Sequence, residues 1–217
     1  MSANHAAFNL IFRFVENYIS PVAGRISSQR HVMAIRDGFI SAMPFMIVGS
    51  FLLVFAYPPF SPDTTWGFAR AWLDLAKEFE GRILTPFDMT MGIMSIYICA
   101  AIAYNLGKHY EKSNQLDPFM CAMLSIMAFL LVAAPKTNGN LPVDSLGGTG
   151  IFTAILVAVY CVEMMRFLKA HNIGIRLPDQ VPPMIKNSFD LLIPVLVVVL
   201  TLYPLSLLIQ HHFDMLI

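Results

Sequence analysis

The chain has 217 residues, of which 57% are apolar and only 13% carry a charge. A soluble domain usually has about 25% charged residues, so the polar side chains here are too few to cover a water-facing surface. The 14 basic and 14 acidic residues balance, which argues against a nucleic-acid partner because such a protein needs charge of one sign. We therefore expect an integral membrane protein.

The first part of the chain precedes any long apolar run. Apolar residues recur at helical spacing from Phe8 to Val22, and polar residues fall on the opposite face. This pattern is typical of an amphipathic helix in the membrane interface, or of an ordinary helix packed on a bundle. We assign residues 1–37 to a cytoplasmic amphipathic segment and residues 38–217 to a membrane domain.

Five apolar runs follow, each close to the roughly 20 residues that a helix needs to cross a bilayer. They are Gly38–Tyr57, Met89–Leu106, Phe119–Ala134, Gly150–Met165 and Phe189–Ile209. Between the first two runs, Trp66–Phe79 has an apolar stripe on one helical face and charges on the other, which predicts a further interfacial helix. The predicted fold is all-α, with about five transmembrane helices plus one or two interfacial amphipathic helices.

The basic residues predict the orientation of these spans. Ten Lys and Arg residues lie on one side of the membrane, against four on the other. The ten are Arg13, Arg25, Arg30, Arg36, Lys108, Lys112, Arg166, Lys169, Arg176 and Lys186. Because Lys and Arg are enriched in cytoplasmic loops, we expect the N-terminus in the cytoplasm and the C-terminus outside.

Small residues repeat every four positions in two of the predicted spans. They are Ser95, Cys99, Ala103 and Gly107 in the second span, and Gly150, Ala154 and Ala158 in the fourth. In lipid, close packing between small residues holds helices together. We expect both stripes to form helix–helix contacts, either within the chain or across a dimer.

No ionisable residue lies in the middle of a predicted span, where transporters usually have one. Glu163 and Asp190 lie near the predicted cytoplasmic boundary, and each has a basic residue at helical spacing, Arg166 and Lys186 respectively. We interpret both acids as structural, the alternative being a cytoplasmic gate or a contact with a soluble partner. The histidines, such as His31, are expected to be exposed at span boundaries. Neither a nucleophile–base pair nor a metal-ligand set or cofactor motif is recognisable, so no catalytic, metal or cofactor site is predicted.

Three stretches carry a family resemblance. Ala34–Ser50, Thr90–Glu111 and Ile175–Val195 resemble the membrane component, enzyme IIC, of bacterial phosphotransferase-system sugar permeases in the lactose, cellobiose and diacetylchitobiose branch. The most specific element is LPDQVPPMIKNSFDLLIP, at Leu177–Pro194. The resemblance covers only about the first half of such a permease. It implies that this first half forms the scaffold and the dimer interface. In the family the His and Glu that hold the sugar belong to the second half, so the substrate-binding residues are unknown here.

The resemblance implies import of a β-linked disaccharide, such as cellobiose or diacetylchitobiose, through the bacterial cytoplasmic membrane. A soluble phospho-carrier subunit, IIB, would phosphorylate the sugar and would contact the loops Gly107–Asp117 and Arg166–Lys186, although basic loops also follow from orientation alone. The chain would then be a transporter component and not itself an enzyme, since phosphorylation would need IIB and the missing second half.

Two hypotheses remain. The first is the N-terminal half of a permease, present as a fragment or encoded by a split or truncated gene. The alternative is a stand-alone interaction protein that dimerises with full-length permeases and modulates them. The sequence stops directly after the last predicted span, which favours truncation. The sequence does not indicate which sugar is transported. It also leaves open which helix face forms a homodimer or a dimer with a related permease.

Overall fold

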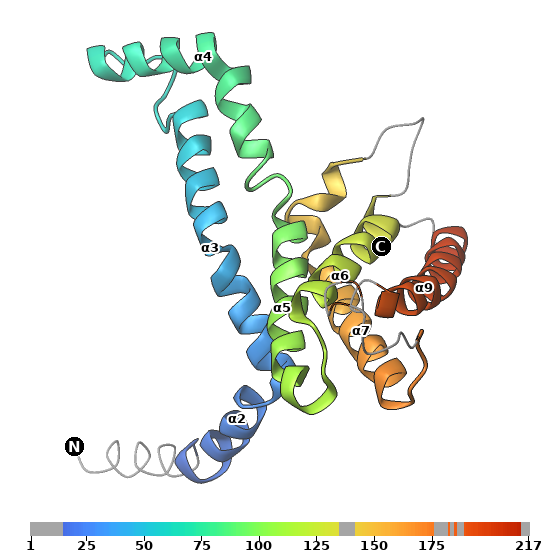
Figure 1. Cartoon of the computed structure of the whole chain (residues 1–217). Coiled ribbons are helices and arrows are strands. Elements are labelled where there is room, and N and C mark those ends of the chain that lie inside the picture. Colours follow the sequence, from blue (N-terminus) through green and yellow to red (C-terminus); the bar gives the residue numbers. More distant parts are fainter. Residues whose placement is uncertain (1–14, 135–141, 176–181, 183–184, 186–188, 214–217) are drawn as a thin grey trace, which may run out of the picture.

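The computed structural model describes residues 15–134, 142–175, 182, 185 and 189–213, and every regular element among them is a helix (Figure 1). The long helices are α3 (Arg30–Ala56), α4 (Gly67–Asp88), α5 (Met94–Asn114), α6 (Pro118–Ala133), α7 (Ile151–Ala170) and α9 (Leu192–Phe213). A π-helical turn at Val15–Ile19 and α2 (Ser20–Ser27) precede α3, and short 3-10 turns at Asp144–Leu146 and Gly148–Gly150 precede α7. The predicted all-α fold is confirmed.

Helices cover each of the five apolar runs, with shifted boundaries. Among the described residues, three stretches are long and apolar enough to cross a membrane: Arg30–Ala56, Gly148–Ala170 and Leu192–Ile209. The equally apolar α6 is shorter, with 16 residues. α5 begins at Met94 and not at Met89, because a turn over residues 89–93 follows α4. It continues to Asn114 and ends where Gln115 adopts a left-handed backbone with φ 52°.

The predictions for both ends of the chain fall largely outside the described residues. The N-terminal amphipathic helix lies largely outside the described residues, and the described α2 has no buried residue. Most of the Leu177–Pro194 stretch also lies outside them. α9 begins at Leu192, so Pro194 lies in its first turn. The N–H groups of the first turn have no carbonyl partner within the helix, so a proline there removes no helical hydrogen bond.

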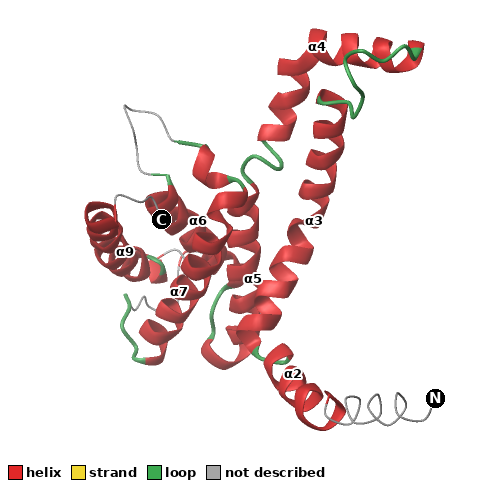
Figure 2. Cartoon of the chain, turned by 180° about the vertical axis from the view of Figure 1, so that it is seen from behind, coloured by secondary structure: helices red, strands yellow, loops and turns green. Residues whose placement is uncertain are grey.

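α3 and α4 extend beyond the other helices, and α4 first lies across the far end of α3 and then runs back beside it towards α5 (Figures 1 and 2). Gly49 of α3 lies against Thr90 and Met91, just before α5 begins. Residues 50–88 therefore project past the start of α5, and we call them the arm. In the arm, the Trp72 indole N–H donates a hydrogen bond to the Phe55 carbonyl at 3.2 Å. The predicted amphipathic helix is thus present, and it continues to Asp88.

α5 lies at the centre of the bundle. It packs against α3, α6 and α7, and α9 covers α6 and α7 on the far side (Figure 2). The α5 side chains Ile98, Ile102 and Leu106 are fully buried. α3 approaches them so closely that a Cβ atom on Gly38 would collide with Ile102. The bundle therefore depends on small residues where its helices cross.

Candidate functional site

The structure places all seven residues of the two predicted stripes in the interior of the bundle. The Ser95 hydroxyl donates a hydrogen bond to the Gly147 carbonyl, and a Cβ on Gly150 would lie 3.2 Å from the Ser95 oxygen. A Cβ on Gly107 would lie 3.1 Å from the Cα of Pro118, at the start of α6. The α5 stripe thus faces α6 and the turn before α7. A role for these residues between two chains stays a prediction.

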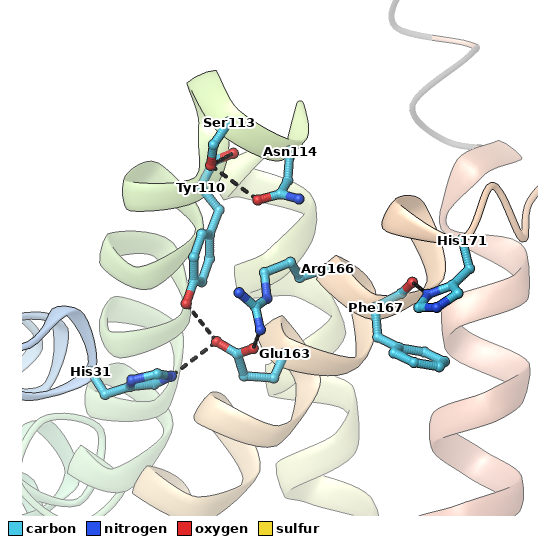
Figure 3. A network of polar contacts seen from close by, with 8 residues as sticks. All are labelled: His31, Tyr110, Ser113, Asn114, Glu163, Arg166, Phe167 and His171. Atoms are coloured by element: carbon cyan, nitrogen blue, oxygen red, sulfur yellow. Dashed lines mark hydrogen bonds and ion pairs between the residues drawn. The ribbon is translucent and has the colours of Figure 1, made fainter.

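The Glu163 carboxylate of α7 contacts three other polar side chains (Figure 3). Its Oε1 accepts a hydrogen bond from the Tyr110 hydroxyl at 2.8 Å and lies 2.9 Å from Nε2 of His31. Its Oε2 lies 2.7 Å from Nη2 of Arg166. These side chains come from α3, α5 and α7, so one carboxylate joins three helices. We call the four residues the Glu163 junction.

The Tyr110 ring holds the Glu163 junction together. Its side chain is 2% exposed, and the guanidinium carbons of Arg30 and Arg166 lie 5.5 Å and 4.9 Å from its ring centroid. Cations at such distances are attracted to an aromatic ring. Tyr110 lies beyond Leu106, where the apolar run of α5 ends. Burial, and then the hydrogen bond to Glu163, raise the pKa of the Tyr110 hydroxyl above its ordinary value.

The sequence predicted only part of this junction. The expected pair of Glu163 with Arg166 is present, but His31 is not a freely exposed imidazole, because its ring contacts Glu163 and its side chain is 33% exposed. The residues His31 and Glu163 are 132 positions apart, so no helical spacing joins them. The packing of α3 and α7 against α5 brings them together.

Asp190 has a partner that the sequence did not indicate. Its Oδ2 lies 3.5 Å from Nζ of Lys169, and that ammonium group also donates to the Gln115 carbonyl at 2.7 Å. The predicted partner, Lys186, lies outside the described residues. Lys169 therefore links the end of α7 to the turn after α5 and to the segment before α9.

Two apolar grooves open on the outside of the bundle. The first, which we call the α9 groove, is a cavity of about 330 Å³ between α6, α7 and α9. It is lined by Val132, Thr153, Leu156, Val157, Tyr160, Leu202, Leu205, Ser206 and Ile209. The second, the α3 groove, has a volume of about 410 Å³ and is lined by Met43, Met46, Ile47, Ser50, Phe51 and Val54. Within the part of the chain that the structure describes, no three His, Cys, Asp or Glu side chains are placed to hold a metal ion.

The helical bundle, its apolar exterior and its polar junction at one end define a membrane protein with several spans. Residues 36–217 match the family described as phosphotransferase system, EIIC, and the chain belongs to this family. It is 36% identical over 206 residues to the cellobiose-specific EIIC component of Geobacillus stearothermophilus, an alignment that covers 86% of this chain and 43% of that protein. It is 29% identical over 218 residues to the lichenan permease IIC component of Bacillus subtilis, covering 93% and 46%.

A solved structure has the same arrangement. The crystal structure of ChbC, the IIC component of an N,N'-diacetylchitobiose-specific phosphotransferase system, superposes with a TM-score of 0.75 at 33% identity. The match covers 93% of this chain and 48% of that one. The chain therefore spans about half the length of these relatives, and its fold corresponds to one half of a IIC component.

Proposed function

We propose that this chain is the scaffold half of a sugar permease of the phosphotransferase system, which imports a β-linked disaccharide together with a second half. The observation that carries the proposal is the match over residues 36–217, which accounts for most of this chain and less than half of each relative. The relatives are named for cellobiose, lichenan and diacetylchitobiose. These carbohydrates share β-glycosidic linkages, and cellobiose and diacetylchitobiose are disaccharides.

The distribution of charge supports a scaffold role. The sequence has no Asp, Glu, Lys or Arg from Gly38 to Ala56, from Pro118 to Ala133 or from Leu192 to Ile209. Sugar sites within membranes need polar groups that converge at the middle of the bilayer. The resemblance to IIC permeases assigns the sugar-holding groups to the second half and phosphorylation to the IIB subunit, so this chain would be a transporter component without its own catalysis.

The Glu163 junction supports the predicted orientation. Arg30 and Arg166 lie at the Tyr110 ring, and Lys169 contacts the turn after α5. This is the end of the bundle where α2 joins it and where α5 and α7 end (Figure 1). Because basic residues favour the cytoplasmic side, this end faces the cytoplasm and the C-terminus lies outside. IIB then contacts the same end, at residues 107–117 and at the loop that begins at Arg166.

The α3 groove is the candidate surface for contact with a second permease chain. Ile47, Phe51 and Val54 are 50%, 63% and 47% exposed, and no other described helix covers them. A homodimer, or a dimer with a related permease, would bury this surface. The same observation supports the second candidate function, a stand-alone protein that binds full-length permeases and modulates them.

An uptake assay separates these functions. Cells that lack related permeases and contain IIB would express this chain alone, or with the second half of the Geobacillus relative as a separate polypeptide. The half-permease proposal expects phosphorylated cellobiose to accumulate only when both halves are present. Uptake by this chain alone would overturn it. Altered uptake by a full-length permease that co-purifies with this chain would instead favour the modulator.

A further inference from the structure

α2 leaves the bundle at the end where α3 begins, and it runs aside from the other helices (Figures 1 and 2). None of its residues is buried. Val22 and Ile26 are one helical turn apart and therefore share a face, and each side chain is 55% exposed. Arg25 is exposed beside them. We call residues 20–30 the α2–α3 corner, which presents apolar side chains and a cation together.

The length of α3 places this corner in the headgroup layer of a bilayer. α3 has 27 residues, Arg30–Ala56, and at about 1.5 Å per residue it is about 40 Å long. A bilayer is about 40–45 Å thick when its headgroups are included. At the far end of α3, the Trp72 indole donates to the Phe55 carbonyl, and tryptophan is typical of membrane interfaces. Because α3 is apolar enough to span, Arg30 lies at the opposite interface, at headgroup depth.

Two arginines of the corner carry charge that no described carboxylate neutralises. Within the described part of the chain, no ion pair joins Arg25 or Arg30 to an acid. The Arg30 guanidinium instead lies over the Tyr110 ring, 5.5 Å from its centroid. The Tyr110 hydroxyl donates to Glu163, but this carboxylate already pairs with Arg166 at 2.7 Å. The positive charge of Arg30 is thus left for another partner.

The other acids near the corner do not supply that partner. Asp37 pairs with Arg36 at 2.8 Å, one residue away on α3. Glu16 is exposed in the turn before α2, and none of the ion pairs between described residues includes it. Residues 20–36 contain three arginines and no Asp or Glu. An anion from outside the chain would therefore balance the charge of the corner.

We propose that the α2–α3 corner binds the headgroup of an anionic phospholipid. The phosphate lies against Arg25 and Arg30, since a guanidinium can bind phosphate oxygens through two parallel hydrogen bonds. Val22 and Ile26 lie at the boundary between the headgroups and the acyl chains. A lipid fits better than a free phosphate, because the corner combines positive charge with exposed apolar side chains. The inference needs only that α3 spans a membrane, so it is independent of the second half of a permease.

Native mass spectrometry of the chain in detergent tests this site. The purified chain would be incubated with equimolar phosphatidylcholine and phosphatidylglycerol, and the bound lipids identified by mass. Wild type is expected to retain more phosphatidylglycerol than phosphatidylcholine. Arg25→Gln and Arg30→Gln are each expected to lower this ratio about five-fold, the contribution of one basic side chain to binding an anionic membrane surface. Arg25→Gln leaves the bundle intact, because α2 has no buried residue.

Arg70→Gln is the matched control, because it removes the same charge from an exposed position of the arm and should leave the ratio unchanged. Equal binding of the two lipids by wild type would overturn the site. An equal fall in the Arg70→Gln variant would also overturn it, because lipid binding would then follow total charge. Inorganic phosphate, replacing chloride at constant ionic strength, should not displace phosphatidylglycerol. Displacement would mean that the corner binds a free anion and that the inference is wrong.

Discussion

The α3–α5 interface and the outer surface of the same α3 helix are built from opposite kinds of apolar residue. Towards α5, α3 presents Ala34, Gly38 and Ala42, all buried. On its outer side Ile47 and Phe51 are exposed. In a bilayer large apolar side chains gain little by leaving lipid, whereas small ones let two backbones approach. On α3, size more than polarity thus distinguishes the face that packs against α5 from the outer face.

The largest expected effect is at the closest approach of α3 and α5. Gly38→Leu would force a side chain into Ile102, including its backbone, which has no room to move. We expect a loss of about 3 kcal/mol or more in the free energy of unfolding, measured by titration with sodium dodecyl sulfate in mixed micelles. Gly81→Leu is the control, since nothing lies within 4 Å of a Cβ there. Equal stability of both variants would show that the contact is not close-packed.

The Glu163 junction provides the second test. Glu163→Gln removes the charge that pairs with Arg166 and that two other helices contact. Hydrogen bonds to charged groups contribute about 2 kcal/mol each, so we expect a loss of that order in the same titration. Glu80→Gln changes an exposed carboxylate that accepts a hydrogen bond from the Tyr57 hydroxyl at 3.0 Å, and should cost about 0.5 kcal/mol or less. An equal loss of stability in Glu163→Gln and Glu80→Gln would contradict the role of the junction in joining the helices.

A larger side chain in the small-residue stripe of the fourth predicted span should lower the free energy of unfolding by a similar or smaller amount. Ala154 is fully buried, and Ala154→Leu adds three carbons to a packed interior, for an expected loss of about 1–3 kcal/mol. Ala71→Leu makes the same change at an exposed position of α4 and should be neutral. If Ala154→Leu folds normally but shifts the protein from dimer to monomer on size exclusion, the stripe acts between chains and not within one.

The smallest effect concerns one hydroxyl group. Tyr110→Phe keeps the ring between Arg30 and Arg166 but loses the 2.8 Å hydrogen bond to Glu163, which should cost about 1 kcal/mol. Because the folded state raises the pKa of Tyr110, this tyrosine stabilises the fold below pH 10 and less as the pH rises beyond it. Stability of wild type should therefore fall more steeply above pH 10 than that of Tyr110→Phe. Parallel curves would rule out this linkage.

The sequence predicted what depends on local spacing. It located helices over the five apolar runs, the amphipathic helix at α4 and the ion pair between Glu163 and Arg166, because each pattern repeats within a few turns of one helix. It did not predict the small-residue face of α3, where Ala34, Gly38 and Ala42 follow the same four-residue repeat as the two recognised stripes. That signal was present in the residues.

Contacts between distant segments had no such signal. The approach of His31 to Glu163 and the contact of Lys169 with Asp190 depend on which helices lie side by side. The α9 groove likewise exists only where three helices meet. A pattern along one helix can indicate which face is apolar, but it cannot indicate which neighbour covers that face.

The central claim is that this chain is a membrane scaffold that needs a second half to hold a sugar. The most direct measurement is equilibrium binding of radiolabelled cellobiose to the purified chain in detergent, with the full-length Geobacillus relative as the positive control. We predict binding to the relative and none to this chain, until the second half is added. Saturable binding to this chain alone, comparable to that of the relative, would contradict the account.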